Sequence, residues 1–548
     1  MKNLYRATRA VLACAAVSAA LLTSANAWAA LTEAQFCALY EKAAEGNQSA
    51  LKTLMTEAQK GNKYAQNNLG VLYKSGQGVA QNYALAAQWY RKAAEQGYAI
   101  AQNNLGGLYY YGHGVAKDYG QALLWYRKAA EQGNAGAQNN LGVQYEFGQG
   151  VAKDYAQAAH WYRKAAEQED ATGQYNFGAL YANGKGFAQD YSQAAQWYRK
   201  AAQQGYANAQ FHLGYLYAHG QGVAQDYSQA LLWYRKAAQQ GNADAQNNLG
   251  ELYYYGHGVA QNYAQAAQWY RKVAEQGDAY AQTNLGYLYD TGQGVAQNYG
   301  QALLWYRKAA EQGNASAQNY LGYLYAHGQG VAQDYGQALL WYRKAAQQGY
   351  ANAQFHLGYL YDTGHGVAQD YGQALLWYRK AAEQGDANAQ NSLGYLYDTG
   401  QGVAQDYGQA LLWYRKAAEQ GDAEAQNNLG ILYETGHGVE KDYAQAAQWY
   451  RKAAQQGNAD AQDNLGDLYK SGTGVARNKV AAYALYSLSA IQDSSGGKEA
   501  SNKRASLADN MTNQEVKDGL TLMRKLYPSG NSLQALDEYL AAQGSGRR

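Results

Sequence analysis

Small and apolar residues recur along this chain with one strict period. The hexapeptide Trp-Tyr-Arg-Lys-Ala-Ala first appears at residues 89–94, and its tryptophan returns every 36 residues, without insertion or deletion, as far as Trp449. Such a period is typical of a stack of identical supersecondary units, each of which contacts mainly its neighbours. We therefore number positions 1 to 36 within each repeat, with residue 63 at position 1 of the first repeat.

The repeat 207–242 illustrates the elements that the pattern predicts. Leu213 and Leu216 lie at helical spacing and predict a first helix, which is expected to end at Gly220 because glycine readily adopts the left-handed conformation. Asp226 is expected to cap a second helix that fills the rest of the repeat. An Asp or Asn occupies this capping position in every full repeat. The pattern therefore predicts two antiparallel helices per repeat.

The same repeat indicates how its helices pack. Trp233, Tyr234 and Ala237 share one side of the second helix, and Gly214 of the first helix is small enough to let the two helices approach. A large ring facing a small residue gives an interdigitated core. We expect that replacing one such tryptophan by alanine lowers the stability by ~3–5 kcal/mol.

The two ends of the chain depart from the repeat. Residues 1–29 have basic residues, an apolar run and small residues typical of a secretory signal peptide, with cleavage expected after Ala27 or Ala29. The alternatives are acylation at Cys14 or an uncleaved anchor. The signal predicts export to the periplasm, or beyond it as a secreted or cell-surface protein, with no membrane span in the mature chain.

Residues 30–62 are predicted to form N-terminal cap helices, and residues 495–548 C-terminal capping helices and a tail. The expected repeats are 63–98, 99–134, 135–170, 171–206, 207–242, 243–278, 279–314, 315–350, 351–386, 387–422, 423–458 and 459–494. The last is atypical, with Leu485-Tyr486 in place of Trp-Tyr.

The full pattern is A-x-A-Q-x-x-L-G-x-L-Y-x-x-G-x-G-V-x-x-[DN]-Y-x-x-A-x-x-W-Y-R-K-A-A. It closely resembles the Sel1-like repeat, a relative of the tetratricopeptide repeat. The resemblance implies an all-α fold, a right-handed α/α solenoid (superhelix) of about twelve 36-residue helix-turn-helix repeats with helical caps at both ends. One departure is that the family usually has proline after Gly-Val, where this chain has alanine or, once, Glu440.

The constant and the variable positions of the repeats lie on opposite sides of the first helix. At about 100° per residue, positions 3, 7, 8, 10 and 11 point one way and barely change, whereas positions 2, 5, 6, 9, 12 and 13 point the opposite way and vary. The invariant side is expected to be a packing face. In the tetratricopeptide superfamily the corresponding varied positions line a concave groove that binds partners, and the resemblance implies the same here.

Aromatic side chains gather on this varied side. Tyrosine combines a large contact area with a small loss of entropy, which suits it to binding hot spots. The alternative explanation is that recently duplicated repeats inherited their tyrosines without selection for binding. The predicted partner-binding residues are Tyr215, Tyr287, Tyr323, Tyr359 and Tyr395 at position 9, Tyr320, His212 and His356 at position 6, and His219 and His327 at position 13.

Motifs that suggest chemistry have simpler interpretations. The Asp-Thr-Gly triplets at Asp290, Asp362 and Asp398 match the aspartic-protease triplet, but they occupy a helix end where other repeats have unrelated residues. His212 and His219 are about 10 Å apart along a helix, too far to bind one metal ion. We therefore expect no catalytic residue, no metal site and no cofactor. With 45 basic and 43 acidic residues, the chain has no signature of a nucleic-acid partner.

Three functions remain in consideration. The first is an exported, non-catalytic protein-binding scaffold or adaptor that uses the concave face, since the resemblance includes exported proteins that engage envelope or host proteins such as secretory immunoglobulin A. The second is binding of peptidoglycan or exopolysaccharide, because tyrosines can stack on sugar rings. The third is a β-lactamase-like hydrolase. Relatives linked to that activity have a disulfide in every repeat, whereas this chain has two cysteines in all, of which only Cys37 remains after cleavage.

Overall fold

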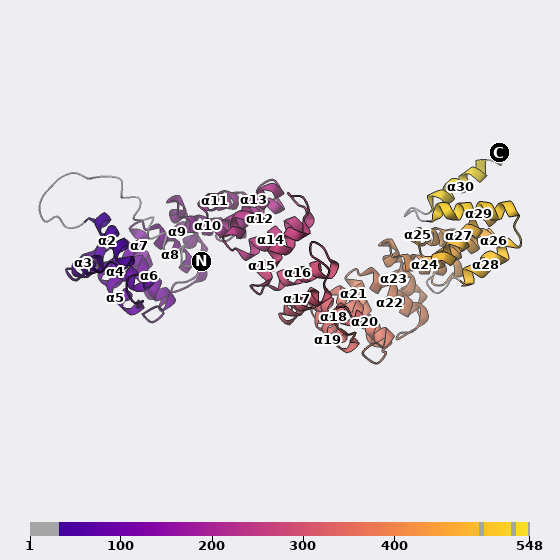
Figure 1. Cartoon of the computed structure of the whole chain (residues 1–548), viewed down its shortest axis with the longest axis horizontal. Helices are drawn as coiled ribbons and strands as arrows, with labels where there is room; N and C mark the ends of the chain where they lie inside the picture. Colours follow the sequence, from indigo (N-terminus) through magenta and orange to yellow (C-terminus); the bar gives the residue numbers. More distant parts are fainter. Residues whose placement is uncertain (1–31, 493–497, 528–532, 546–548) are drawn as a thin grey trace. The chain divides into compact units, whose positions relative to one another are not determined.

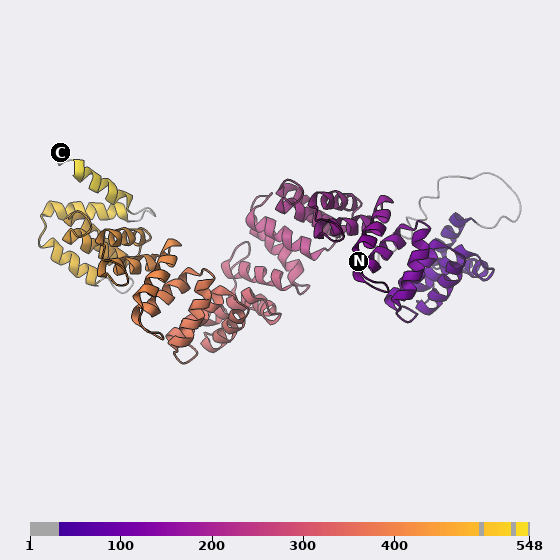
Figure 2. The same cartoon turned by 180° about the vertical axis from the view of Figure 1, so that it is seen from behind.

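The computed structural model describes residues 32–492, 498–527 and 533–545, and all regular secondary structure in this part of the chain is α-helical. The predicted signal peptide, residues 1–29, lies outside it. The described residues form two compact units, one that ends at Trp269 and one that begins at Tyr270. Within each unit the helices lie in pairs, and each pair packs against the next (Figure 1; Figure 2). The predicted all-α fold of paired helices is confirmed.

Each repeat contributes a first helix over positions 1–13 and a second helix over positions 21–33 or one residue less. The first helices are α4 (Lys63–Ser75), α6 (Ala99–Tyr111), α8 (Ala135–Phe147), α10 (Ala171–Asn183), α12 (Ala207–His219), α14 (Ala243–Tyr255), α16 (Ala279–Thr291), α18 (Ala315–His327), α20 (Ala351–Thr363), α22 (Ala387–Thr399), α24 (Ala423–Thr435) and α26 (Ala459–Ser471).

The second helices follow the same register, apart from the longer last one. They are α5 (Tyr83–Glu95), α7 (Tyr119–Glu131), α9 (Tyr155–Glu167), α11 (Tyr191–Gln203), α13 (Tyr227–Gln239), α15 (Tyr263–Ala274), α17 (Tyr299–Glu311), α19 (Tyr335–Gln347), α21 (Tyr371–Glu383), α23 (Tyr407–Glu419), α25 (Tyr443–Gln455) and α27 (Lys479–Gln492).

The helix ends are fixed by the predicted turn residues. The Asp226 carboxylate accepts hydrogen bonds from the backbone N–H groups of Ser228 and Gln229, and so caps α13. Gly220 ends α12 in the left-handed conformation, at φ 65°. Gly222 also has positive φ, and a Cβ there would lie 2.2 Å from the backbone of Tyr191 in the preceding repeat. This position therefore has to be glycine for the repeats to approach.

The ring that fills each repeat is the tyrosine of the hexapeptide rather than its tryptophan. Tyr234 is only 1% exposed, and a Cβ at Gly214 would lie 2.8 Å from its ring. The predicted contact of a large ring with a small residue is therefore confirmed, with tyrosine in that role. Trp233 instead belongs to a hydrophobic cluster that includes Leu213 of its own repeat and residues from the second helix of the preceding repeat.

The tryptophans are less uniformly buried than expected. Trp233 is 8% exposed, whereas Trp341 and Trp377 are half-buried. The lysine three residues later covers the ring, with its Nζ between 3.7 Å (Lys452 on Trp449) and 4.9 Å (Lys164 on Trp161) from the ring centroid. The tryptophan therefore belongs to the contact between repeats, and the lysine on its own helix shields its ring from solvent.

A buried glutamine at position 4 joins each repeat to its neighbour. The side-chain amide of Gln102 donates to the carbonyl of Ala94 in the preceding repeat at 3.0 Å, and its oxygen accepts from Gln132 of its own repeat at 2.7 Å. The same two bonds recur along the chain, for example at Gln354. Because both polar ends of the amide are satisfied, its burial stabilises the stack instead of costing free energy.

Additional helices close both ends of the repeat array. Before the repeats lie α2 (Glu33–Ala44) and α3 (Gln48–Gln59), and after them α28 (Lys498–Ala508), α29 (Asn513–Leu526) and α30 (Gln534–Ser545). The predicted capping box at the start of α29 is present, with Thr512 and Glu515 bonded reciprocally. Cys37 lies on α2 and is partly buried, and Cys14 lies outside the described residues.

Candidate partner-binding face

The varied side of the first helices, called here the first-helix face, consists of positions 2, 5, 6, 9, 12 and 13. Its position-9 tyrosines are exposed at Tyr215 (37%), Tyr323 (37%), Tyr359 (45%) and Tyr395 (47%). Tyr287 is half-buried. The opposite side carries buried residues at positions 3, 7, 8 and 10 in these repeats. The predicted packing side is present and also includes position 4. The prediction that position 5 is open is wrong in part, because Thr283 (6% exposed) and Asn319 (5% exposed) are buried.

The predicted residues at position 6 do not lie freely on this face. His356 stacks on Tyr342 of the preceding repeat, with ring centroids 4.9 Å apart, and lies 6.5 Å from the ring of Tyr323. Tyr320 has the same place, 5.0 Å from Tyr306 and 6.0 Å from Tyr287. These rings fill the joint between two repeats, so their main contacts are structural and only their edges border the face.

His212 repeats this arrangement in the first unit, 5.4 Å from Tyr198 and 5.6 Å from Tyr175. Burial among these rings lowers the pKa of His212, with Asp244 acting weakly in the opposite direction. Burial, helped by the nearby His327, lowers the pKa of His356 to about 4. Both imidazoles are therefore neutral at pH 7 and act as aromatic rings.

The predicted histidines at position 13 are exposed and pair with the tyrosine one turn earlier. The rings of His219 and Tyr215 stack at 4.0 Å, and those of His327 and Tyr323 at 3.9 Å. The structure thus brings Tyr323, His327 and His356 together in one aromatic cluster. Tyr359 and Tyr395 stand on later helices of the same unit, with the largest exposed fractions among the predicted position-9 tyrosines.

A row of carboxylates at position 12 was missed by the sequence prediction. The hydroxyl of the buried tyrosine at position 28 donates to this carboxylate, from Tyr378 to Asp362 at 3.0 Å and from Tyr450 to Glu434 at 2.6 Å. Burial raises the pKa of Asp362, although this bond acts in the opposite direction. The Asp-Thr-Gly triplets dismissed as protease motifs thus have a structural role, since their aspartates anchor core tyrosines.

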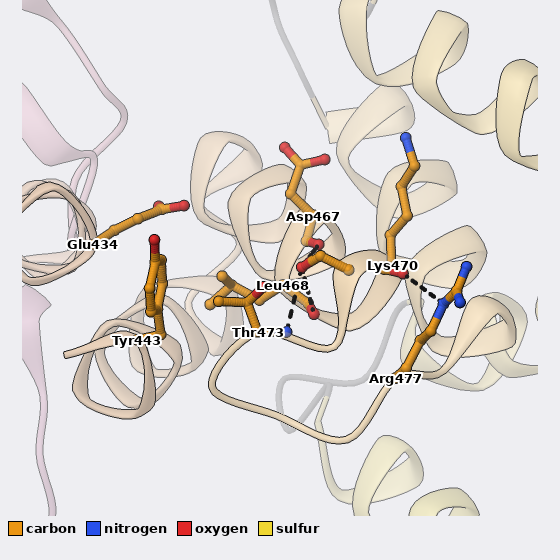
Figure 3. A pocket seen from close by; sticks show the side chains of 8 residues that line it. Glu434, Tyr443, Asp467, Leu468, Lys470, Thr473 and Arg477 are labelled. Carbon is orange, nitrogen blue, oxygen red and sulfur yellow. Dashed lines mark hydrogen bonds between the residues drawn. The ribbon is translucent and has the colours of Figure 1, made fainter. Parts of the chain in front are cut away.

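Two hollows open among the C-terminal repeats. One, of about 530 Å³, has Glu434 and the Tyr443 hydroxyl on one side and Lys470 and Arg477 on the other (Figure 3). Asp467 and Thr473 also line it. Its carboxylates are those of Glu434 and Asp467, and Asp467 is also paired with Lys503.

The other hollow, of about 320 Å³, lies on the first-helix face itself. The first helices of four successive repeats contribute to it, and no lysine or arginine lines it. Tyr395 is the only predicted site residue in its wall. The lining residues are Asp362, Asn391, Ser392, Tyr395, Glu424, Asn427, Asn428, Asn458 and Asp460.

Within the part of the chain that the structure describes, no group of three or more His, Cys, Asp or Glu residues could hold a metal ion. In the same residues, no helix is long and apolar enough to cross a membrane. The first-helix face presents aromatic rings, amides and carboxylates.

Comparison with known proteins decides the family. The profile described as Sel1 repeat matches twelve consecutive stretches that together cover residues 63–494. The chain belongs to the Sel1 repeat family. A comparison with curated proteins finds no match.

Solved structures of other Sel1 repeat proteins are similar to this one. A protective antigen present in uropathogenic Escherichia coli strains, which displays an SLR fold, is 41% identical, with a TM-score of 0.74 over 83% of this chain and 97% of that protein. A Sel1 repeat protein from Oxalobacter formigenes is 35% identical, with a TM-score of 0.46 over 56% of this chain and 89% of that one.

The Sel1 repeats of this chain share a second link that the sequence prediction missed. The guanidinium of the hexapeptide arginine donates to the tyrosine hydroxyl at position 11 of the next repeat, from Arg343 to Tyr361 at 2.9 Å and from Arg199 to Tyr217 at 2.8 Å. The invariance of position 11 was a usable signal, because a tyrosine needed only for packing could be replaced by phenylalanine.

Proposed function

We propose that this protein is an exported, non-catalytic scaffold that binds another protein through the first-helix face of its C-terminal repeats. The observation that carries the proposal is the exposure of Tyr323, Tyr359 and Tyr395 on helices whose opposite sides are fully packed. A soluble stack does not need these rings for stability, whereas large exposed aromatic side chains are typical of binding hot spots.

Export is part of the proposal. The amino-terminal segment has the composition of a secretory signal, and the similarity to a protective antigen of uropathogenic E. coli supports a periplasmic, secreted or cell-surface location. The expected result is that amino-terminal sequencing of protein from the periplasm or the medium starts at Trp28 or Ala30. Detection of the uncleaved chain in the cytoplasm alone would contradict export.

The test of binding is capture of partners from envelope extract and host mucosal fluid by the wild-type chain and by a double variant, Tyr323→Ala with Tyr359→Ala. Each ring is exposed, so the melting curve should stay unchanged while partners identified with the wild type are lost. The matched control is Tyr111→Ala with Tyr255→Ala, which removes two exposed tyrosines at position 13 of earlier repeats. Equal capture by wild type and the Tyr323/Tyr359 variant would refute the proposal.

Glycan binding is a second candidate, favoured by the 320 Å³ hollow, in which Tyr395 stands beside the amides of Asn391, Asn427 and Asn428. A ring flanked by amides can stack on a sugar and bond its hydroxyls. Retention of the protein on peptidoglycan or exopolysaccharide, lost on Tyr395→Ala and insensitive to salt, would favour this function over protein binding.

A further inference from the structure

The charges of the first-helix face differ sharply from those of the rest of the C-terminal repeats. In residues 279–458 this face has no lysine or arginine, because the basic residues of the hexapeptide all stand on the second helices. Its carboxylates are Asp290, Asp362, Asp398, Glu424 and Glu434, and Asp460 follows in the last repeat. None of these six is in a salt bridge with a lysine or arginine among the described residues.

One earlier repeat shows what such a carboxylate binds when a cation is available. Glu146, at position 12, accepts a hydrogen bond from the Tyr162 hydroxyl at 2.9 Å through one oxygen. Its other oxygen lies 3.1 Å from the ammonium of Lys185, which comes from position 15 of the next repeat. The same ammonium lies 5.6 Å from the ring centroid of Tyr155. The repeat geometry thus holds an ammonium between a tyrosine-anchored carboxylate and an aromatic ring.

The C-terminal repeats keep this arrangement but lack the lysine. Asp362 and Glu434 are anchored by tyrosine hydroxyls in the same way as Glu146. The residues in the place of Lys185 are Gln401 and Thr473. In the second case the carboxylate and the ring of Tyr443, which corresponds to Tyr155, border the 530 Å³ hollow (Figure 3). No lysine of the described chain therefore meets either carboxylate in a salt bridge.

We propose that the partner of this face is a polypeptide segment rich in lysine or arginine, which places basic side chains beside Asp362, Glu424 and Asp460. This inference rests on the proposed function, since it names the chemistry of the partner that the tyrosines bind. The 320 Å³ hollow gathers these three carboxylates around Tyr395 without any basic residue in its wall. It offers an ion pair and a ring face to one ammonium or guanidinium group.

The test uses the full chain and two fluorescent decapeptides, one of alternating lysine and serine and one of alternating glutamate and serine. Fluorescence anisotropy in 20 mM NaCl should show binding of the lysine peptide only. Glu424→Gln with Asp460→Asn should weaken it by about tenfold, because both carboxylates are exposed at the hollow and their charges are lost without a change of shape. Binding should also fall at 300 mM NaCl, where exposed charges are screened.

The matched control is Glu383→Gln with Glu419→Gln, which removes the same charge from exposed positions of the second helices. It should leave the affinity for the lysine peptide within twofold of wild type. Equal weakening by the two double variants would mean that net charge alone is sensed, and would overturn the proposal. Equal binding of the lysine and glutamate peptides would overturn it too.

Tyr395 gives a check that depends on the ring. Tyr395→Ala should weaken the lysine peptide, whereas Tyr395→Phe should retain it, because the ring and not the hydroxyl faces the cation. The two proposals fail separately. If the Tyr323/Tyr359 variant loses its captured partners while the Glu424/Asp460 variant keeps both partners and lysine peptide, the binding function stands and the basic partner is refuted. If the Glu424/Asp460 variant loses affinity for the lysine peptide while the Tyr323/Tyr359 variant keeps its captured partners, the proposal that the tyrosines bind the partner is refuted.

Discussion

The N-terminal repeats (63–242) and the C-terminal repeats (279–494) share one core and differ in one face. Both regions have the buried tyrosine at position 28, the glutamine links and the arginine links between repeats. At position 9, however, the first four N-terminal repeats carry Val71, Gly107, Val143 and Ala179, whereas the first four C-terminal repeats carry tyrosine throughout.

The carboxylates on the first-helix face also differ between the N-terminal and the C-terminal repeats. On the first-helix face, Glu146 is the acidic residue of the N-terminal repeats, and Lys185 neutralises it. On this face of the C-terminal repeats, Lys503 pairs with Asp463 and Asp467 of the last repeat, whereas the six carboxylates named above have no lysine or arginine partner among the described residues. Because the core is the same in both regions, packing does not require this difference. The comparison indicates that the two faces are suited to different surroundings.

The largest expected effect is the loss of stability when a buried tyrosine is removed, and it should be equal in the N-terminal and C-terminal repeats. Tyr162→Ala and Tyr378→Ala each remove a fully buried ring, so each should lower the free energy of unfolding by ~3–5 kcal/mol in urea denaturation followed by circular dichroism. Trp377→Ala should cost less than Tyr378→Ala, because the indole is half-buried. A loss confined to one region would break the view that both share one core.

The next effect depends on pH and tests a joint in the C-terminal region. The pKa of His356 is lowered to about 4 in the folded protein, below its ordinary value of 6.5, so the unfolded chain binds the extra proton between these values. Stability is therefore full above pH 6.5 and decreases as the pH falls toward 4, by about 2–3 kcal/mol at pH 4.5. His356→Phe should flatten this decrease in urea titrations at pH 7.5 and 4.5. The exposed His160→Gln should leave it intact.

The smallest expected effect comes from removing the lysine beside Glu146 on the N-terminal face and adding one beside Glu434 on the C-terminal face. Lys185→Gln should leave Glu146 without its cation at a cost of ~0.5 kcal/mol or less, because the pair is partly exposed. Thr473→Lys should supply the missing ammonium beside Glu434 and raise the melting temperature slightly. If the comparison is right, the first variant gains affinity for the lysine decapeptide and the second loses some, as anisotropy titrations would measure. No change in either would show that Glu146 and Glu434 do not take part in binding the peptide.

Much of the fold could be predicted from the sequence because its signals are local and repeated. Capping by Asp226, the left-handed Gly220 and the spacing of Leu213 and Leu216 each act within one repeat, and all three appear in the structure as expected. The choice between Trp233 and Tyr234 as the buried ring could not be made in this way. It depends on how far one repeat is rotated against the next, which a helical period does not specify.

The candidate site was predictable only in part, for the same reason. The exposure of Tyr359 follows from its angle on one helix, and the structure agrees. The burial of His356 and Tyr320 depends on rings from the preceding repeat, so the angle alone misplaced them on the open face. The bond from Tyr378 to Asp362 joins two helices of one repeat, and no periodic signal distinguished that aspartate from a turn residue.

The glutamine at position 4 has a consequence for how such a chain can change. Most joints use the same amide, the same alanine carbonyl and the same second glutamine, as at Gln102 and again at Gln354, although the side-chain oxygens of Gln246 and Gln462 accept no such bond. One repeat can therefore be copied, deleted or exchanged in frame without redesigning the neighbour that receives it. The repeats are therefore interchangeable. During evolution the number of repeats and their exposed residues can change while the hydrogen bonds between repeats stay the same.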